Sequence, residues 1–433
     1  MELATSAALV GTALAGVLMG AVAGAVPGLH VYNMAGAALL LFSRGALDLS
    51  GDAFAFLLLG MAVGWCFASL VPAVFLFAPD ESSAHSVLPA SKLVLRGAGM
   101  QALLIMSLSA LMAVLMLALL APFAETLLRP ARAIIAPHAG WMLLAIIAFI
   151  LLGEWPRGRT LGQAWAGLGG GLLVFALSGL IGMVLMLRSP VAIESAFQNL
   201  LPAFTRLFVV PSLLAAAWLG RRTPAQTEAV MEMPATTLLR GAATGVLGGL
   251  FASFLPVVSG GVGGLLAGHA TAQRGDALFL ASQGASRTAY LLGSILLLFV
   301  PGVGLTRGGL AWMLSSVYLP YGPRLYALAV CALCLCSALA FGLCWVMGLC
   351  AARFVPQLNM RAVALCSLVI TVSMTGIFTG AGGLLVALVC TPVGLIPISM
   401  GTRRMNALGV ILLPITLGMN GWLVPVARVF GLI

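Results

Sequence analysis

The chain has 433 residues, of which 62% are hydrophobic and only 7% are charged, and its mean hydropathy is +1.14. Soluble domains carry about a quarter charged residues, so this composition excludes a soluble protein and predicts an all-α polytopic membrane protein. The formal net charge of +10 comes from basic residues scattered singly or in pairs. Nucleic-acid binding, which needs basic residues gathered on one face, is therefore not expected.

Apolar stretches of about 20 residues, the length that crosses a bilayer, recur along the whole chain. Proline and glycine interrupt many of them, so we expect ten to thirteen spans, with broken or re-entrant helices included. The first, Thr5–Val26, follows Glu2 without a basic segment, which indicates a retained helix and not a cleaved signal peptide. The later stretches are Ala53–Phe77, Gly99–Ala121, Ala133–Leu152, Ala164–Leu187, Phe204–Leu219, Leu238–Leu255, Ala277–Val300, Leu325–Cys350, Ala362–Phe378 and Gly380–Ser399, with shorter runs at Leu408–Leu417 and Trp422–Ile433.

The first apolar stretch carries glycines at every fourth position and then breaks. Gly16, Gly20, Gly24 and Gly28 share one helical face, where another backbone can approach closely. Pro27-Gly28 ends the helix, and we expect helix to resume from about Met34. A break inside lipid must be buried in protein or line a cavity. The candidate substrate-binding residues at this first break are Pro27, Gly28, His30 and Asn33.

A polar segment follows the second apolar stretch. Asp80 and Glu81 come after Pro79, and His85 lies four residues beyond Glu81 on the same predicted helical face. These three residues, Asp80, Glu81 and His85, are candidates for ion coupling. An ordinary solvated helix start accounts for the same pattern, and both interpretations stay open.

The second half of the chain repeats the first at a spacing of 229 positions, from Gly16 to Gly245 and from Pro27 to Pro256. We therefore predict two transmembrane repeats, 1–220 and 237–433, joined by a polar linker, 221–236. Inverted repeats are the expectation, although a parallel arrangement also fits. The second break supplies the substrate-binding candidates Pro256, Ser259, Gly260 and Gly261, because free N–H groups at a helix start suit an anion.

A polar cluster lies within the apolar stretch after the second break. It contains Gln283, Ser286, Arg287 and Thr288, and a membrane helix does not carry such residues without a reason. Arg287 is a candidate counter-charge for an anionic substrate. Snorkelling of its side chain to a membrane surface is the alternative.

Enzyme and metal signatures do not emerge from the sequence. It lacks a phosphate-binding loop and a zinc-protease motif, and the cysteines gathered in Leu325–Cys350 have no histidine or carboxylate among them. Ser178-Gly179 and Ser259-Gly260 are similar to the surroundings of intramembrane serine nucleophiles, but no histidine companion is evident. We expect no enzyme activity, no cofactor and no metal.

Several segments together resemble the large membrane subunit (TctA) family of tripartite tricarboxylate transporters, and its shorter archaeal-type branch most of all. They are GAVAGAVPGLHVYNMAGAALLL, SLVPAVFLFAPDESSAHSVLPASKLVLRGAGMQAL, FLPVVSGGVGG and GLIPISMGTRRMNALGVILLPI. The chain departs from the family pattern at Ala78–Glu81, where a threonine-rich element is usual, and at Val257, where glycine follows proline. The resemblance implies a two-repeat secondary transporter for organic anions, with a small membrane subunit and a periplasmic solute-binding protein as partners.

The residues and the resemblance together predict an ion-coupled permease of the inner (cytoplasmic) membrane. Its substrate would be an anionic small molecule, expected to be a carboxylate, and the coupling ion would be sodium or a proton. Alternating access between the two broken hairpins would carry the substrate across. A polyprenyl-phosphate or other lipid-phosphate translocase is the first alternative, and an intramembrane hydrolase is the second.

Overall fold

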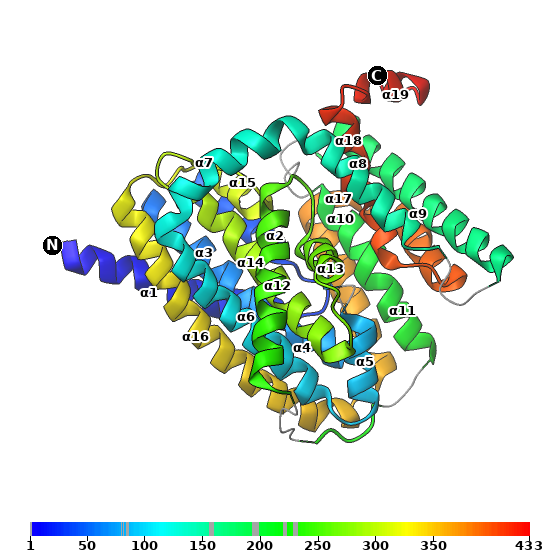
Figure 1. Ribbon diagram of the computed structural model, residues 1–433, viewed down its shortest axis with the longest axis horizontal. Coiled ribbons are helices and arrows are strands. Elements are labelled where there is room, and N and C mark those ends of the chain that lie inside the picture. The colour runs from blue at the N-terminus through cyan, green and yellow to red at the C-terminus, as the bar shows by residue number, and fades with distance from the viewer. Residues whose placement is uncertain are drawn as a thin grey trace. The chain divides into compact units, whose positions relative to one another are not determined.

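The computed structural model describes residues 2–78, 80, 82–83, 86–155, 160–192, 199–219, 223–227 and 233–433. These residues are helical nearly throughout, and no strand occurs among them (Figure 1). Seven of the described helices are long and apolar enough to cross a membrane, or eight if the bent pair Arg404–Met419 and Leu423–Val429 forms one span. The chain is thus an α-helical multi-pass membrane protein. The predicted count of ten to thirteen spans is not confirmed.

Two long helices explain part of the difference in the number of spans. Helix α14 (Asp276–Phe299) has 24 residues, but the polar cluster around Arg287 keeps it from being uniformly apolar. Helix α17 (Met360–Met400) has 41 residues and contains one residue with non-helical angles, Gly380, at φ 62°. At a rise of about 1.5 Å per residue, α17 is roughly twice as long as a bilayer is thick. The apolar stretches predicted from the sequence divide the same region into two segments, Ala362–Phe378 and Gly380–Ser399.

Contacts divide the chain into two compact units. Unit 1 contains residues 1–132 and 220–360, and unit 2 contains residues 133–219 and 361–433. Each unit therefore takes segments from both predicted repeats. The helices of unit 1 are α1 (Glu2–Ala25), α2 (Val31–Ser43), α3 (Gly51–Ala68), α4 (Leu70–Phe75), α5 (Val87–Leu95), α6 (Gly99–Leu120), α12 (Ala235–Phe254), α13 (Gly260–Ala270), α14, α15 (Gly309–Ser315) and α16 (Pro323–Phe354). Helix α7 (Ala124–Ile135) begins in unit 1 and ends in unit 2.

Unit 2 contains α8 (Ala139–Leu152), α9 (Leu161–Leu187), α10 (Leu200–Phe204), α11 (Val210–Leu219), α17, α18 (Gly409–Met419) and α19 (Leu423–Val429). Its polar interior centres on Glu154, which accepts hydrogen bonds from the Arg403 backbone N–H at 2.8 Å and from the Asn406 side chain at 2.9 Å. Between α10 and α11 the chain forms one π-helical segment, Thr205–Val209, which holds the buried Arg206.

In unit 1 the glycine face predicted for α1 packs against α3. A side chain at Gly16, Gly20 or Gly24 would collide with backbone atoms of the segment from Leu57 to Ser69. Each later glycine faces residues further along this segment. The two helices therefore run in the same direction with their backbones in close contact, as small residues at membrane helix interfaces allow.

The second half of the chain has a matching helix pair, α12 and α14. Side chains at Gly241, Gly245 or Gly249 would collide with α14 in the same progressive order, from Leu278 to Tyr290. Gly16 faces the backbone nitrogen of Met61 and Gly245 faces that of Ser286. The pairs thus keep spacings of 229 residues for the first helix and 225 for the second. Figure 1 shows α12, α13 and α14 lying together.

The α1–α3 pair and the α12–α14 pair run in opposite directions. The rings of Phe56 and Phe299 lie 6.0 Å apart, and the Cys66 thiol lies 3.4 Å from the Thr288 hydroxyl. Moving forward along α3 from Phe56 to Cys66 therefore means moving backward along α14 from Phe299 to Thr288. The tips of the two broken hairpins consequently approach one region near the middle of α14.

Residues 223–227 of the predicted linker 221–236 lie against the turn that follows α5. The Thr227 N–H donates to the Gly97 carbonyl at 2.8 Å, and the Gln226 side chain bonds the Val94 carbonyl and the Gly99 N–H, each at 2.9 Å. Helix α12 then begins at Ala235, just before the predicted end of the linker. Residues 223–227 are thus held to the body of unit 1.

Candidate functional site

The first predicted break is confirmed and is shorter than expected. Helix α1 ends at Ala25 and α2 begins at Val31, not at about Met34. Gly28 has φ 85°, a conformation that glycine adopts without steric cost. The His30 side chain caps α2 early, because its Nδ1 accepts the Tyr32 N–H at 3.2 Å. Asn33 therefore lies in the first turn of the resumed helix and is buried.

The second predicted break has the same construction. Helix α12 ends at Phe254 and α13 begins at Gly260, both 229 positions after the corresponding ends in the first hairpin. The Ser259 hydroxyl caps α13 by accepting the Val262 N–H at 3.5 Å. Val257 stands at the position of Gly28 and has φ 56°. A β-branched residue in this left-handed conformation is strained.

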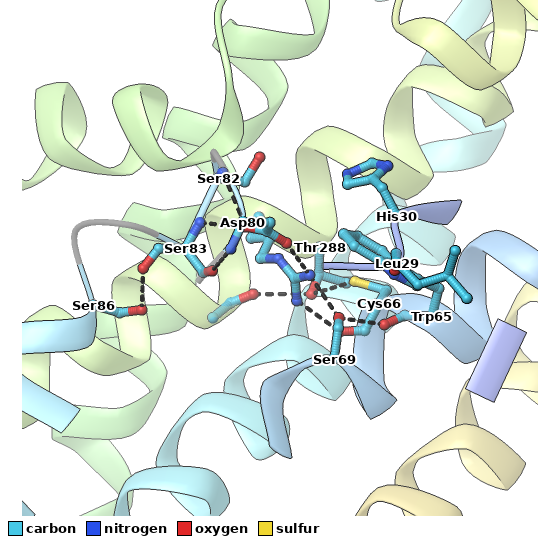
Figure 2. A network of polar contacts seen from close by, with 12 residues as sticks. Leu29, His30, Trp65, Cys66, Ser69, Asp80, Ser82, Ser83, Ser86 and Thr288 are labelled. Atoms are coloured by element: carbon cyan, nitrogen blue, oxygen red, sulfur yellow. Dashed lines mark hydrogen bonds and ion pairs between the residues drawn. The ribbon is translucent and has the colours of Figure 1, made fainter. Parts of the chain in front are cut away.

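The tip of the first hairpin is fixed to α3 by Trp65. The indole N–H of Trp65 donates to the Leu29 carbonyl at 2.9 Å. The His30 ring lies over the indole with a centroid distance of 4.2 Å, and it contacts the Tyr32 ring at the same distance. Figure 2 shows Leu29, His30 and Trp65 lying together beside Cys66 and Ser69. The hydrogen bond from Trp65 satisfies the Leu29 carbonyl in the broken segment, as a break within a membrane protein requires.

Arg287 stands at the centre of the polar network. Its guanidinium donates to the Cys66 carbonyl at 2.8 Å, to the Ser69 hydroxyl at 2.7 Å and to the Asp80 carboxylate at 2.6 Å. It also lies over the Trp65 ring, 4.7 Å from the centroid, in a cation–π arrangement. Its side chain is only 3% exposed. Arg287 therefore points into the protein, which excludes the snorkelling alternative.

Asp80 lies in a turn after α4 and is held by three groups. Its Oδ1 accepts the backbone N–H groups of Ser82 at 3.0 Å and Ser83 at 2.6 Å, and its Oδ2 accepts Arg287. Figure 2 shows Asp80 between Ser82 and Ser83, facing the α3 residues. Desolvation by burial raises the pKa of Asp80, but Arg287, His30 and the Ser83 hydrogen bond lower it by more. The carboxylate is ionised at neutral pH.

The second hairpin meets the same network from the other side. The Ser286 hydroxyl donates to the Gly260 carbonyl at 2.7 Å, and the Gln283 amide donates to the Gly261 carbonyl at 3.4 Å. A side chain at Gly260 would collide with the Arg287 backbone. Gln283 is 1% exposed, and its Oε1 has no hydrogen-bond partner among the described residues. The start of α13 therefore packs directly beside the buried arginine.

The structure brings some of the predicted site residues into one region and does not bring others there. His30, Asp80, Gly260 and Arg287 belong to one connected region through the contacts above. Ser259 caps α13 beside it. Pro27, Gly28, Pro256 and Gly261 form or follow the two breaks, and Asn33 lies on α2. Glu81 and His85 lie outside the described residues. Their proposed ion-coupling roles remain predictions.

Sequence reasoning missed three members of the network: Trp65, Cys66 and Ser69. One signal was available, because tryptophan in membrane helices concentrates at the membrane surface, whereas Trp65 lies well inside an apolar stretch. Cys66 and Ser69 contribute a backbone carbonyl and a hydroxyl to Arg287. Neither contribution can be recognised from residue type alone.

The intramembrane hydrolase alternative finds no support in the described residues. The Ser178 hydroxyl donates to backbone carbonyls of Phe175 and Asn406 at 3.2 and 3.5 Å, and Ser259 caps a helix. Among the residues that the structure describes, no group of three or more His, Cys, Asp or Glu side chains could hold a metal ion. What the network contains is a buried arginine whose hydrogen bonds go to Cys66, Ser69 and Asp80.

The helical fold, the broken helix pairs and the buried arginine are features that many membrane transporters share. Comparison with known proteins identifies the family: residues 10–409 match the tripartite tricarboxylate transporter TctA family, and the chain belongs to it. A similar protein is the uncharacterized protein MJ1079 of Methanocaldococcus jannaschii, 25% identical over 408 residues, which are 92% of this chain and 96% of the relative. No solved structure matches the chain.

Proposed function

We propose that the chain is the permease of an ion-coupled secondary transporter that binds a carboxylate-bearing small solute between its two broken hairpins, Pro27–Asn33 and Pro256–Gly264. The observation that carries this proposal is the position of Arg287. It is a fully buried cation beside the tips of both hairpins. Charges within membrane segments are costly and are kept where they serve a pathway or a ligand.

The chemistry of Arg287 suits a carboxylate. A guanidinium presents several N–H donors in a plane and can bind both oxygens of a carboxylate at once. The Trp65 ring beneath it restricts its orientation. The unpaired Gln283 Oε1 on the same helix face supplies an acceptor for a substrate hydroxyl or a water molecule. Family membership supports an organic anion as the substrate.

We infer that the α1–α3 and α12–α14 pairs belong to two inverted repeats. Three observations support this inference: the breaks coincide at a spacing of 229 residues, the helix caps His30 and Ser259 occupy equivalent positions, and the two pairs run in opposite directions. Inverted repeats allow one half to adopt the conformation of the other, which is how many transporters alternate access. The sequence halves 1–220 and 237–433 remain the proposed extent of the repeats.

Asp80 has a different role in this mechanism from the coupling role predicted from sequence. We propose that Asp80 occupies the anion-binding donors of Arg287 when no substrate is present, and that a substrate carboxylate replaces it. Asp80 is a carboxylate already held at 2.6 Å from the guanidinium, so it is a tethered competitor of the substrate. Glu81 and His85 remain the candidates for sodium or proton coupling.

Direct binding measurements on the purified full chain test both the site and the role of Asp80. Citrate and succinate should bind the wild type, and Asp80→Asn should tighten binding by roughly tenfold or more, because a tethered group competes at an effective concentration in the millimolar range. Asp276→Asn is the matched control, since Asp276 forms an exposed ion pair with Lys92. Weaker binding by Asp80→Asn would refute the competitor role, whereas absence of binding by every variant would refute the carboxylate site.

Uptake into proteoliposomes tests the transport function. Labelled dicarboxylates and tricarboxylates should accumulate under a sodium or a proton gradient, and dissipating the gradient should stop accumulation. Transport of a polyprenyl phosphate without carboxylate transport would favour the lipid-phosphate alternative. The assay should be repeated with the partners that the family implies, a small membrane subunit and a periplasmic solute-binding protein, because delivery of substrate by such a protein would limit the rate.

The proposed location is the inner (cytoplasmic) membrane. A periplasmic partner requires the binding site to open to the periplasm, and an ion gradient exists across that membrane. Fractionation of cells that express a tagged chain, followed by purification with the membrane intact, would identify both the membrane and any co-purifying subunits.

A further inference from the structure

Helix α7 is strongly amphipathic and continues from the end of α6. Its polar side chains Glu125, Arg129 and Arg132 share one face, and Leu127 lies on the opposite face. A helix with basic residues on one face and leucines on the other is typical of a segment that lies in the plane of the membrane surface. We therefore place the first turns of α7 at a lipid headgroup level.

A cavity of about 180 Å³ lies beneath α7 in unit 1. Helices α6, α7, α12, α14 and α16 all contribute to its wall. Among the lining side chains are Leu117, Leu128, Leu250, Phe254, Leu297 and Tyr326. The wall is almost entirely apolar, and the Tyr326 hydroxyl is engaged by donating to the Ala121 carbonyl at 2.9 Å. Such a wall suits a hydrocarbon chain and offers nothing that would hold a carboxylate.

Two arginines lie beside this cavity without an acidic partner. Arg307 donates from Nε to the carbonyl of Phe254, a lining residue, at 3.2 Å. Arg132 directly follows Ala131, another lining residue, and its positive charge, after burial, contributes to lowering the pKa of Arg307. No ion pair with a carboxylate is formed by either arginine among the described residues. Arg129, in contrast, pairs with Glu125 at 2.5 Å.

Neighbouring like charges repel, and an anion between them removes that repulsion. An apolar cavity with two cations beside it that form no ion pair in the described part of the chain matches a single ligand chemistry. We propose that this site binds an anionic phospholipid, with one acyl chain in the cavity and the phosphate between Arg132 and Arg307. The acyl chain would contact Leu250 and Phe254, the last turn of α12 before the second break.

Native mass spectrometry of the delipidated full chain tests the site, with phosphatidylglycerol and phosphatidylcholine as probes. The wild type should bind one phosphatidylglycerol about tenfold more tightly than phosphatidylcholine, because each arginine adds a favourable interaction with the anionic headgroup. The double variant Arg132→Ala/Arg307→Ala should lose this preference. Arg44→Ala is the matched control, because Arg44 is an exposed arginine at the C-cap of α2 and does not line the cavity.

A second variant tests the cavity separately from the charges. Ala124→Phe places a large side chain at the cavity wall and should weaken binding of both lipids, whereas Arg132→Ala/Arg307→Ala should weaken only phosphatidylglycerol. Equal affinity of the wild type for the two lipids would overturn the proposal. An equal loss of preference in Arg44→Ala would also overturn it, because it would show a general effect of surface charge. Neither measurement requires a transported substrate.

Discussion

The two broken hairpins of unit 1 have nearly the same backbone and quite different side chains. Each consists of a long helix, a five-residue break and a shorter capped helix, and each first helix packs through glycines on a parallel helix. The side chains that face the centre differ. At the spacing of 225 residues that relates α3 to α14, Arg287 corresponds to Ala62 and Tyr290 corresponds to Trp65. One half supplies the cation, and the other supplies the ring beneath it.

This difference fits the proposed arrangement, in which a repeated scaffold holds a single asymmetric site. The glycine faces and the breaks determine where the backbone of each hairpin lies, and both hairpins have these features. The polar network depends on different residues at equivalent positions, and the proposed anion site lies where the two hairpin tips approach each other. Predictions that compare equivalent positions therefore separate the scaffold from the site.

The largest expected effect comes from Arg287. Arg287→Ala should abolish carboxylate binding and should also destabilise the protein by about 3–5 kcal/mol, because it leaves Asp80 buried without its cation. Arg287→Ala/Asp80→Asn should regain most of the stability without regaining binding. Denaturant unfolding in detergent and substrate titration measure the two effects separately. Carboxylate binding by the double variant would show that Arg287 is a structural residue only.

The next effect tests the shared scaffold. Gly20→Leu and Gly249→Leu should each destabilise the protein by about 1–3 kcal/mol or more, because both side chains would collide with the backbone of the parallel helix. Gly11→Leu is the control within α1, since a side chain there meets no atom within 4 Å. Similar thermal unfolding of Gly20→Leu and Gly11→Leu would contradict the close packing of α1 on α3.

A smaller effect distinguishes the two breaks. Gly28→Val should destabilise by about 1–2 kcal/mol, because it forces a β-branched residue into a left-handed conformation. Val257→Gly should change stability in the opposite direction, by at most about 1 kcal/mol, since relief of strain is partly offset by the entropy of glycine. The free energies of unfolding of the two variants check the sign. Destabilisation by Val257→Gly would mean that the valine side chain contributes more than its strained backbone costs.

The smallest effect concerns the helix caps. Ser259→Ala should cost about 1 kcal/mol, and Ser259→Thr should restore most of it. His30→Ala removes a cap and two ring contacts, so it should cost somewhat more than His30→Asn, which keeps a capping side chain. Comparison of the four unfolding free energies separates capping from ring packing. Equal values for His30→Ala and His30→Asn would show that His30 does not cap α2.

Local patterns in the sequence predicted the breaks well and the network poorly. Pro27-Gly28 and Pro256 mark interruptions through backbone chemistry that acts within a few residues, and both breaks occur there. The start of α2 was misplaced because His30 serves as the cap, a role that Ser, Thr, Asp and Asn usually fill. Four-residue spacing of glycines likewise predicted the face of α1 that packs on α3.

The contacts of Arg287 depend on packing between segments about 200 residues apart. Asp80 and Trp65 reach Arg287 through tertiary packing of distant segments, which no local pattern encodes. Sequence reasoning identified both Arg287 and Asp80 as functional candidates but did not pair them. The number of spans was equally difficult, because hydropathy alone cannot show how breaks such as Gly380 divide a long helix.

The glycine contacts of α1 have a mechanical consequence. Because the two backbones touch at Gly16, Gly20 and Gly24, no side-chain rotation can accommodate a small sliding movement of α1 along α3. The next arrangement with the same fit lies four residues away, a step of about 6 Å. The register of this helix pair can therefore change only in discrete steps. The α1–α3 pair consequently moves as one rigid body during any rearrangement of the hairpin tips.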